Sequence, residues 1–275
     1  MKVSKLVQST GAWRAFVAAT LLALVVLAVN LFTDELQPGN AWGLAYGTLA
    51  AVLMFAVALF GVRRRVVPFT KRVGLGRAQT WVQFHVYAGT VALLLFLMHT
   101  GFRWPNSALG WWLFVLSIWV SVSGLLGVFL QKWIPRILTS GLSIEVLYDR
   151  IPELIAEIRE KAEQLVAASA EPVREFYRRN VAPALHGPQV RLVYYFDITG
   201  GIRTQTRQFE YLRKLLDGEE QRRFAELEEY YRAKLEIDAH YTLQRALRWW
   251  LYLHVPPSLA LLALIGLHLF TVLYY

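Results

Sequence analysis

Residues 81–102 read WVQFHVYAGTVALLLFLMHTGF, an apolar run that carries two histidines, His85 and His99. At 1.5 Å per residue, a helix of this length crosses the hydrocarbon core of a bilayer. An ionisable side chain is costly in such a segment, so a histidine there is a candidate functional residue by default. The histidines, more than the apolar residues around them, therefore set this segment apart from an ordinary membrane helix.

Four further apolar runs of similar length accompany this one, in a chain of 275 residues that is 56% hydrophobic. The first of them follows Lys2 and Lys5, as a signal peptide would, but it is longer than a typical signal core and no small-x-small cleavage site follows it. We therefore expect it to be retained. The composition predicts an all-α membrane protein with five transmembrane helices, at residues 13–32, 42–62, 81–102, 111–130 and 249–274.

The formal charge of +9 is distributed unevenly along the chain. Basic residues precede the first run and fill the loop between the second and third, whereas Asp34 and Glu35 lie between the first and second. The positive-inside bias then predicts a multi-pass protein of the inner, cytoplasmic membrane, with the N-terminus and residues 131–248 in the cytoplasm and the C-terminus outside. This segregation argues against a nucleic-acid partner and for the lipid bilayer. The basic residues concerned are Lys2, Lys5, Arg14, Arg63, Arg64, Arg65, Lys71, Arg72 and Arg77.

The chain contains no cysteine. This excludes c-type haem attachment, cysteine-ligated iron–sulfur clusters and disulfides within the chain. A redox centre here is expected to be held by histidine.

Four histidines form two matched pairs, since His85 and His99 are 14 positions apart in the third run, as are His254 and His268 in the fifth. Fourteen steps of a helix return to within about 40° of the starting direction and climb about 21 Å, so each pair lies on one face near opposite ends of its helix. Because the third and fifth helices run in the same direction, His85 should face His254 and His99 should face His268. The pattern predicts two metal sites of two histidines each, and with them two non-covalent b-type haems in a haem-binding bundle.

Other roles for the four membrane histidines are also consistent with the sequence. These residues can be structural residues bonded to carbonyls, or part of a proton relay or a metal-transport path. His186, in a polar turn, and His240, just before the fifth run, are expected to face solvent without a role.

Other residues are weaker candidates for holding a haem. Gly89, one turn after His85, leaves room for a flat macrocycle, although glycine also serves plain helix packing. Arg103 is expected to neutralise the propionates of the outer haem, and Arg77 and Arg248 those of the inner one. Simple snorkelling of the three arginines to the interface is the alternative.

Residues 131–248 form the one polar segment, so the predicted domains are 1–130, 131–248 and 249–275. Residues 144–166 have the spacing of an amphipathic helix, which Pro152 limits at its start. Residues 190–198 resemble a strand that turns at Thr199, Gly200 and Gly201 into a small hairpin with residues 202–208. From Phe209 a helical pattern resumes, broken at Asp217 and Gly218, and Asp238 is expected to cap a helix that continues into the fifth membrane span.

The string His85-x13-His99-x-Gly-x-Arg103, with Gly89 between the histidines, resembles the first haem-bearing helix of cytochrome b in quinol–cytochrome c oxidoreductases. Leu253-His254 followed by prolines, and His268-Leu-Phe, resemble the second. The use of the third and fifth helices is similar to the ferric reductase and NADPH oxidase membrane domain. This resemblance implies transmembrane electron transfer, although the chain has neither the Pro-Glu-Trp-Tyr quinol motif nor flavin and nicotinamide domains.

The leading hypothesis is an electron-transfer subunit of a larger oxidoreductase complex, with other redox subunits as partners. One alternative is a quinol or quinone oxidoreductase subunit with its own quinone site, for which Tyr46, Tyr87 and Tyr252 are candidate polar groups. A second is a non-redox membrane scaffold or transporter.

Overall fold

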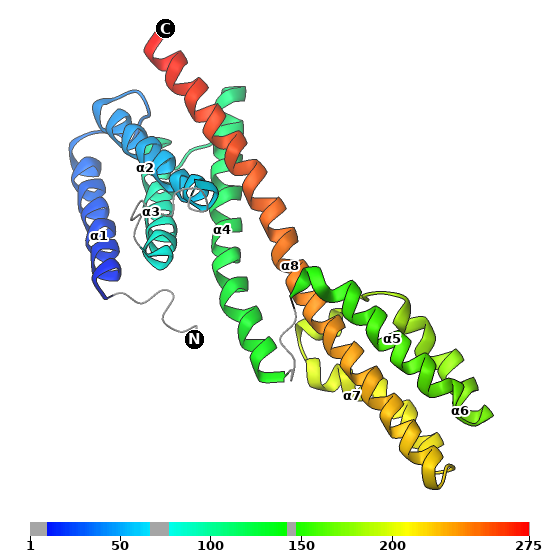
Figure 1. Ribbon diagram of the computed structural model, residues 1–275. Helices are drawn as coiled ribbons and strands as arrows, with labels where there is room; N and C mark the ends of the chain where they lie inside the picture. The colour runs from blue at the N-terminus through cyan, green and yellow to red at the C-terminus, as the bar shows by residue number, and fades with distance from the viewer. Residues whose placement is uncertain (1–9, 67–76, 142–146, 275) are drawn as a thin grey trace. The chain divides into compact units, whose positions relative to one another are not determined.

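The computed structural model describes residues 10–66, 77–141 and 147–274, and these residues are mostly helical, with no strand among them. Figure 1 shows the order of the helices along the chain. They are α1 (Thr10–Thr33), α2 (Ala41–Val66), α3 (Ala78–His99), α4 (Ala108–Gly141), α5 (Ile151–Ala167), α6 (Glu171–Phe176), α7 (Ile198–Arg213) and α8 (Gly218–Tyr274), with short turns η2 (Tyr148–Arg150), η3 (Tyr177–Val181), η4 (Ala182–His186) and η5 (Leu192–Tyr195).

Five of these helices, α1, α2, α3, α4 and α8, are long and apolar enough to cross a membrane. The predicted number of membrane helices is therefore confirmed, and the chain has the character of a multi-pass membrane protein. The structure divides into two compact units: residues 1–129 with 250–275, and residues 130–249.

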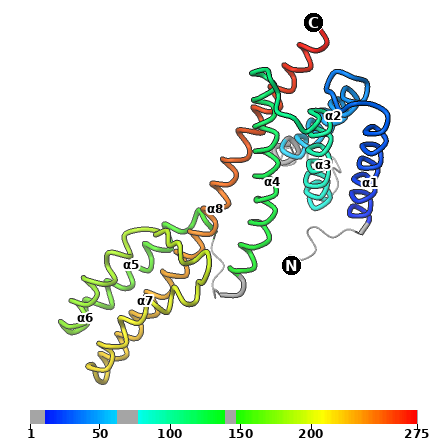
Figure 2. Tube along the Cα trace, turned by 180° about the vertical axis from the view of Figure 1, so that it is seen from behind, coloured from blue at the N-terminus to red at the C-terminus, as the bar shows by residue number. Residues whose placement is uncertain are grey.

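In the first unit, α2 packs along α3, and α1 also contacts α3 (Figures 1 and 2). Tyr46, Ala50, Leu95 and Met98 form a buried cluster between these helices. The hydroxyl of the buried Tyr46 is satisfied because it donates a hydrogen bond to Oδ1 of Asn30 on α1, at 3.1 Å. Small residues at such interfaces let helix backbones approach closely, as membrane packing requires.

Two tryptophans join α4 to α8 around the prolines of α8. Pro257 has no N–H, so the carbonyl of Leu253, four residues earlier, lacks its usual helical donor. The indole Nε1 of Trp119 donates to that carbonyl at 2.9 Å, and Trp250 donates to the carbonyl of Ser123 at 2.7 Å. The helix α8 is continuous through both prolines because its neighbour satisfies a carbonyl that they release.

The second unit has one large core, in which the first half of α8 is packed by α5, α7 and the end of α4, and a smaller cluster of Ile151, Ile155 and Ile237 beside it. The amphipathic helix predicted at residues 144–166 is confirmed from Ile151 onward as α5, with Pro152 in its first turn, whereas Leu147 is extended and Tyr148–Arg150 form the turn η2. Ile151, Ile155 and Ala162 face the interior. The beginning of the predicted segment, residues 144–146, lies outside the described residues.

The predicted hairpin at residues 190–208 is wrong, because these residues form η5 and the first part of α7. Asp197 caps α7 by accepting a hydrogen bond from the Gly200 N–H at 2.8 Å, so the two glycines open a helix. Tyr194 is fully buried in the core, where burial raises the pKa of its hydroxyl above the usual range. Within this stretch Tyr194 and Ile198 are buried, whereas Leu192, Val193 and Phe196 are exposed, so packing of a few side chains in the core overrode the local strand propensity.

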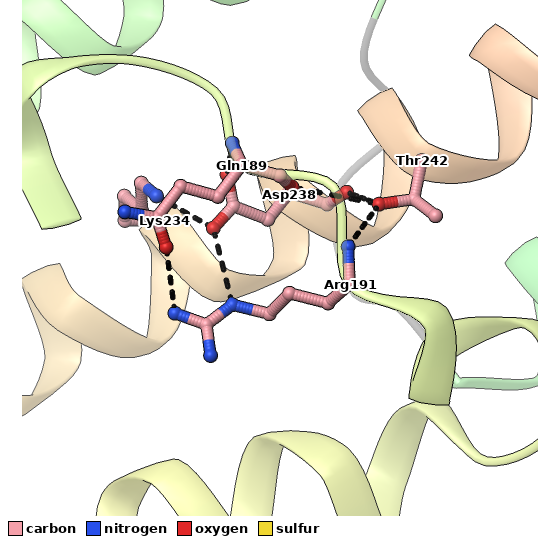
Figure 3. Close-up of polar contacts among 5 residues, drawn as sticks. All are labelled: Gln189, Arg191, Lys234, Asp238 and Thr242. Atoms are coloured by element: carbon pink, nitrogen blue, oxygen red, sulfur yellow. Dashed lines mark hydrogen bonds and ion pairs between the residues drawn. The ribbon is translucent and has the colours of Figure 1, made fainter.

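The expected roles of Asp238 and His240 are also wrong. Asp238 lies within α8, which already begins at Gly218, and it bonds Nζ of Lys234 at 2.5 Å in the core (Figure 3). His240 is 4% exposed and lies near Gln244, whereas His186 is exposed as expected. A charged residue in a long helix resembles a cap in the sequence, but here it is buried with a partner of opposite charge four residues away.

Candidate functional site

The four membrane histidines meet in two pairs within the first unit. The ring centroids of His85 and His254 are 6.3 Å apart, and those of His99 and His268 are 6.4 Å apart. The ring planes cross at 72° and 66°. The structure thus brings together the two pairs expected from the 14-residue spacing.

Backbone carbonyls of α2 orient both histidines of α3. Nδ1 of His85 lies 3.1 Å from the carbonyl oxygen of Val57, and Nδ1 of His99 lies 2.8 Å from that of Gly43. A carbonyl can only accept, so in each ring Nδ1 carries the proton and donates it. The other nitrogen, Nε2, then keeps a free lone pair, which is the form of imidazole that binds a metal.

A hydroxyl group orients His254. Oγ of Ser123 lies 2.9 Å from Nδ1 of His254 and donates its own proton to the carbonyl of Val120 at 3.1 Å. The hydroxyl therefore accepts from Nδ1, and Nε2 of His254 is again the free nitrogen. Trp250 stacks on the same ring, with centroids 5.6 Å apart and planes 19° apart. The ring of His254 is therefore held at Nδ1 by Ser123 and on its face by Trp250.

A glycine makes room for His99. A Cβ added to Gly47 would lie 2.7 Å from Nδ1 of His99 and 2.9 Å from Cε1. Gly124 is less crowded, since a Cβ there would lie 3.4 Å from Cε1 of His254. The close approach of α2 to His99 thus requires the absence of a side chain at position 47.

Each histidine pair borders a cavity, and the two cavities differ in size. The cavity at His99 and His268 has a volume of about 600 Å³, and its lining includes polar groups, among them Arg103. The cavity at His85 and His254 has about 120 Å³ and is lined by Gly89. Cofactor pockets usually have about 300–1,000 Å³, so the first already has cofactor dimensions, whereas the second requires its lining to move outward.

The spacing of the paired rings fits one metal ion between each pair. An imidazole nitrogen binds a first-row metal at roughly 2.0–2.1 Å, so the centroids of two imidazoles on opposite sides of one ion are roughly 6.3–6.5 Å apart. Within the described ranges, no cluster of three or more His, Asp or Glu side chains suited to a bare metal ion is found. Two opposed imidazoles suit a porphyrin, which brings four nitrogens of its own.

The other predicted site residues have different surroundings. Gly89 and Arg103 line the cavities as described, and Arg77 is exposed at the start of α3. Arg248 lies in the second unit, where Nη2 donates to Oδ1 of Asp149 at 2.7 Å and the guanidinium covers the ring of Tyr148. Its predicted contact with a haem has no support in these interactions.

Sequence reasoning missed the groups that orient the rings, namely Gly47, Ser123 and Trp250. A glycine or serine in a membrane helix is too common to indicate a histidine partner. The three tyrosines considered for a quinone do not line either cavity. Tyr46 bonds Asn30, Tyr87 stacks on Phe16, and Tyr252 is exposed.

No family model, curated protein or solved structure matches this chain. The resemblance to cytochrome b and to the ferric reductases rests on the motif residues alone and stays a prediction.

Proposed function

We propose that the chain is a transmembrane electron-transfer protein that holds two b-type haems, one between His85 and His254 and one between His99 and His268. The observation that carries the proposal is the pair of ring separations, 6.3 Å and 6.4 Å, which equal the spacing of two imidazoles on one metal. The membrane character of the helices supplies the setting.

The bonds at Nδ1 support the same proposal. Three of the four rings are held by a carbonyl or a hydroxyl in the orientation that frees Nε2. Such outer partners fix the tautomer and raise the basicity of a ligating histidine. If the histidines only stabilised helix packing, nothing would require two imidazole rings at the separation expected for two ligands of one metal ion.

The arrangement indicates what the chain's residues do. His85 with His254, and His99 with His268, would each hold one haem from both sides, which would favour electron transfer over binding of oxygen or substrate at the metal. A haem held there would supply reversible one-electron chemistry. The two histidine levels are separated by about 21 Å along each helix, so the sites span most of the hydrocarbon core.

The donor and the acceptor are proposed to be other redox subunits of a membrane complex. We place the His85–His254 site on the cytoplasmic side and the His99–His268 site on the outer side, on the basis of the charge distribution of the loops. A tag near Glu219 should then be cytoplasmic and one after Tyr275 external, which accessibility labelling of intact cells measures. An external signal at Glu219 would reverse the direction of the proposed path.

The experiment that tests the function is quantification of haem in the purified chain, with reduced-minus-oxidised spectra. We expect two non-covalent haems per chain, both six-coordinate and low-spin. Crossed imidazole planes should also give a strongly anisotropic low-spin electron paramagnetic resonance signal in the oxidised protein. The proposal would be overturned if the chain, purified in the presence of excess haem, bound one haem or none. The His186→Ala variant, changed at an exposed histidine, is the matched control.

A further inference from the structure

The second unit exposes apolar side chains in two loops that lie at the same end of it. In η5 and the residues after it, Leu192 is 71% exposed and Phe196 is 87% exposed. Leu147, just before η2, is 70% exposed. Large apolar groups gathered at one end of a domain mark a surface that contacts something other than water.

The position of the first loop is set by hydrogen bonds to α8 (Figure 3). The Gln189 N–H donates to Oδ1 of Asp238 at 2.9 Å, and the Arg191 N–H donates to Oγ1 of Thr242 at 3.2 Å. The hydroxyl of Tyr195 donates to the carbonyl of Thr242 at 3.2 Å. These contacts turn Tyr195 toward α8 and leave Phe196 on the outside.

The second loop is attached to the next turns of α8. Tyr148 stacks on Tyr241 with centroids 5.4 Å apart, and Arg248 bonds Asp149 as described above. Both loops thus contact α8 between Asp238 and Arg248. The apolar part of α8 begins at Trp249, and Thr242 precedes it by about 10 Å of helix.

The helices that follow the loops run away from this end (Figure 2). The far end of α5 is marked by the Ala170 N–H, which donates to Oε2 of Glu220 at 2.9 Å. The far end of α7 is marked by an ion pair between Arg213 and Glu228. The loops before α5 and α7 therefore form the end of the second unit at which α8 leaves it.

We propose that this end, defined by Leu147, Leu192, Val193 and Phe196, docks on the lipid headgroups of the membrane that α8 enters. The headgroup zone is about 5–8 Å thick on each side of the hydrocarbon core. A loop bound to Thr242, about 10 Å of helix before the apolar part of α8, therefore lies near enough for side chains that extend from it to reach this zone. The proposal is independent of the haems, because it rests only on the membrane character of α8 and on contacts within the second unit.

The charges at this end fit anionic lipids. Arg245 lies near Tyr241, with its guanidinium 5.8 Å from the ring centroid, and Arg248 is half exposed. Of the carboxylates here, Asp149 is paired with Arg248, Glu153 is paired with Arg150, and Asp197 is occupied as the cap of α7. Protein surfaces that bind membranes at the level of the headgroups typically combine basic residues with exposed apolar side chains.

The natural absence of cysteine makes a direct test simple. Phe196→Cys and Leu147→Cys, each in the full chain, are labelled with a nitroxide and reconstituted into nanodiscs that contain anionic lipid. Collisions with oxygen, which partitions into lipid, are compared with collisions with a water-soluble nickel chelate. Tyr211→Cys is the matched control, since Tyr211 is an aromatic residue with an exposed fraction of 76%, between those of Leu147 and Phe196, near the far end of α7.

We expect the ratio of oxygen to nickel collisions to rise at positions 196 and 147 relative to position 211. The proposal is overturned if the three labels give the same ratio, because the loops would then lie in water. It is also overturned if labels 196 and 147 are shielded from both reagents, which would indicate coverage by protein. Circular dichroism of each labelled variant verifies that the helices are intact.

Discussion

The two histidine sites have almost the same ring separation but different surroundings. At His99 and His268, α2 comes so close that only glycine fits at position 47, and a cavity of about 600 Å³ opens beside Arg103. At His85 and His254, the cavity is about 120 Å³, and a serine and a tryptophan hold one ring. Ring separation is thus a property of two helices in register, whereas the space and the hydrogen bonds around each ring come from their neighbours.

The largest expected effect is the loss of one haem, and the histidine that is replaced should decide which haem is lost. His85→Ala and His254→Ala should each remove the same haem, and His99→Ala and His268→Ala should each remove the other, because a porphyrin that loses one axial imidazole is held only by packing and the remaining ring. Haem quantification and redox titration of the four variants measure this. If His85→Ala and His268→Ala fall in one spectral class, the pairing is wrong.

A smaller effect should be confined to the His99–His268 site. Gly47→Ala places a Cβ 2.7 Å from Nδ1 of His99, and overpacking of this kind costs about 1–3 kcal/mol. We expect haem retention at this site to fall roughly tenfold or more, measured by competition with apo-myoglobin.

Gly61→Ala is the matched control for this variant. Gly61 is on the same helix, α2, and a Cβ there meets nothing within 4 Å. Equal losses for the two variants would show that the contact with His99 is unimportant.

An effect of similar kind is expected at the other site. Ser123→Ala removes the hydroxyl that accepts from Nδ1 of His254, and loss of such a partner typically costs about 10–100-fold in metal affinity. Because the remaining ring is less basic, the oxidised iron is stabilised less, so the potential of the His85–His254 haem should rise. Ser117→Ala, on the same helix beside the other cavity, should leave this haem unchanged; an equal shift would contradict the assignment.

The smallest effect is expected from Arg103→Gln. Arg103 is exposed, and exposed ion pairs contribute only about 0.2–1 kcal/mol, so the potential of the His99–His268 haem should change by no more than a few tens of millivolts. Redox titration resolves such a change. If only the potential of the His85–His254 haem shifted, the role that we infer for Arg103 at the larger cavity would be wrong.

Part of this organisation was predictable because it depends on short-range periodicity. The five apolar helices follow from run length, and α5 follows from apolar spacing together with Pro152. For residues 190–208 the prediction from composition was wrong. The composition suits a strand, whereas the cap at Asp197 and the burial of Tyr194 favour a turn and a helix. Local propensity differs from the observed structure where contacts with distant residues contribute more free energy.

The sequence by itself determined which histidines face each other, since a helix of constant pitch converts 14 residues into one face and about 21 Å, and the count of membrane crossings makes the third and fifth helices run in the same direction. Only the tertiary structure decided which atoms orient them, because the carbonyl of Gly43 and the hydroxyl of Ser123 come from helices that the histidine spacing does not specify. It also decided that Arg248 pairs with Asp149, a residue 99 positions away, and that Asp238 lies in a core. Periodicity is a local property of the chain, whereas hydrogen-bond partners and cavity volumes depend on how separate helices pack.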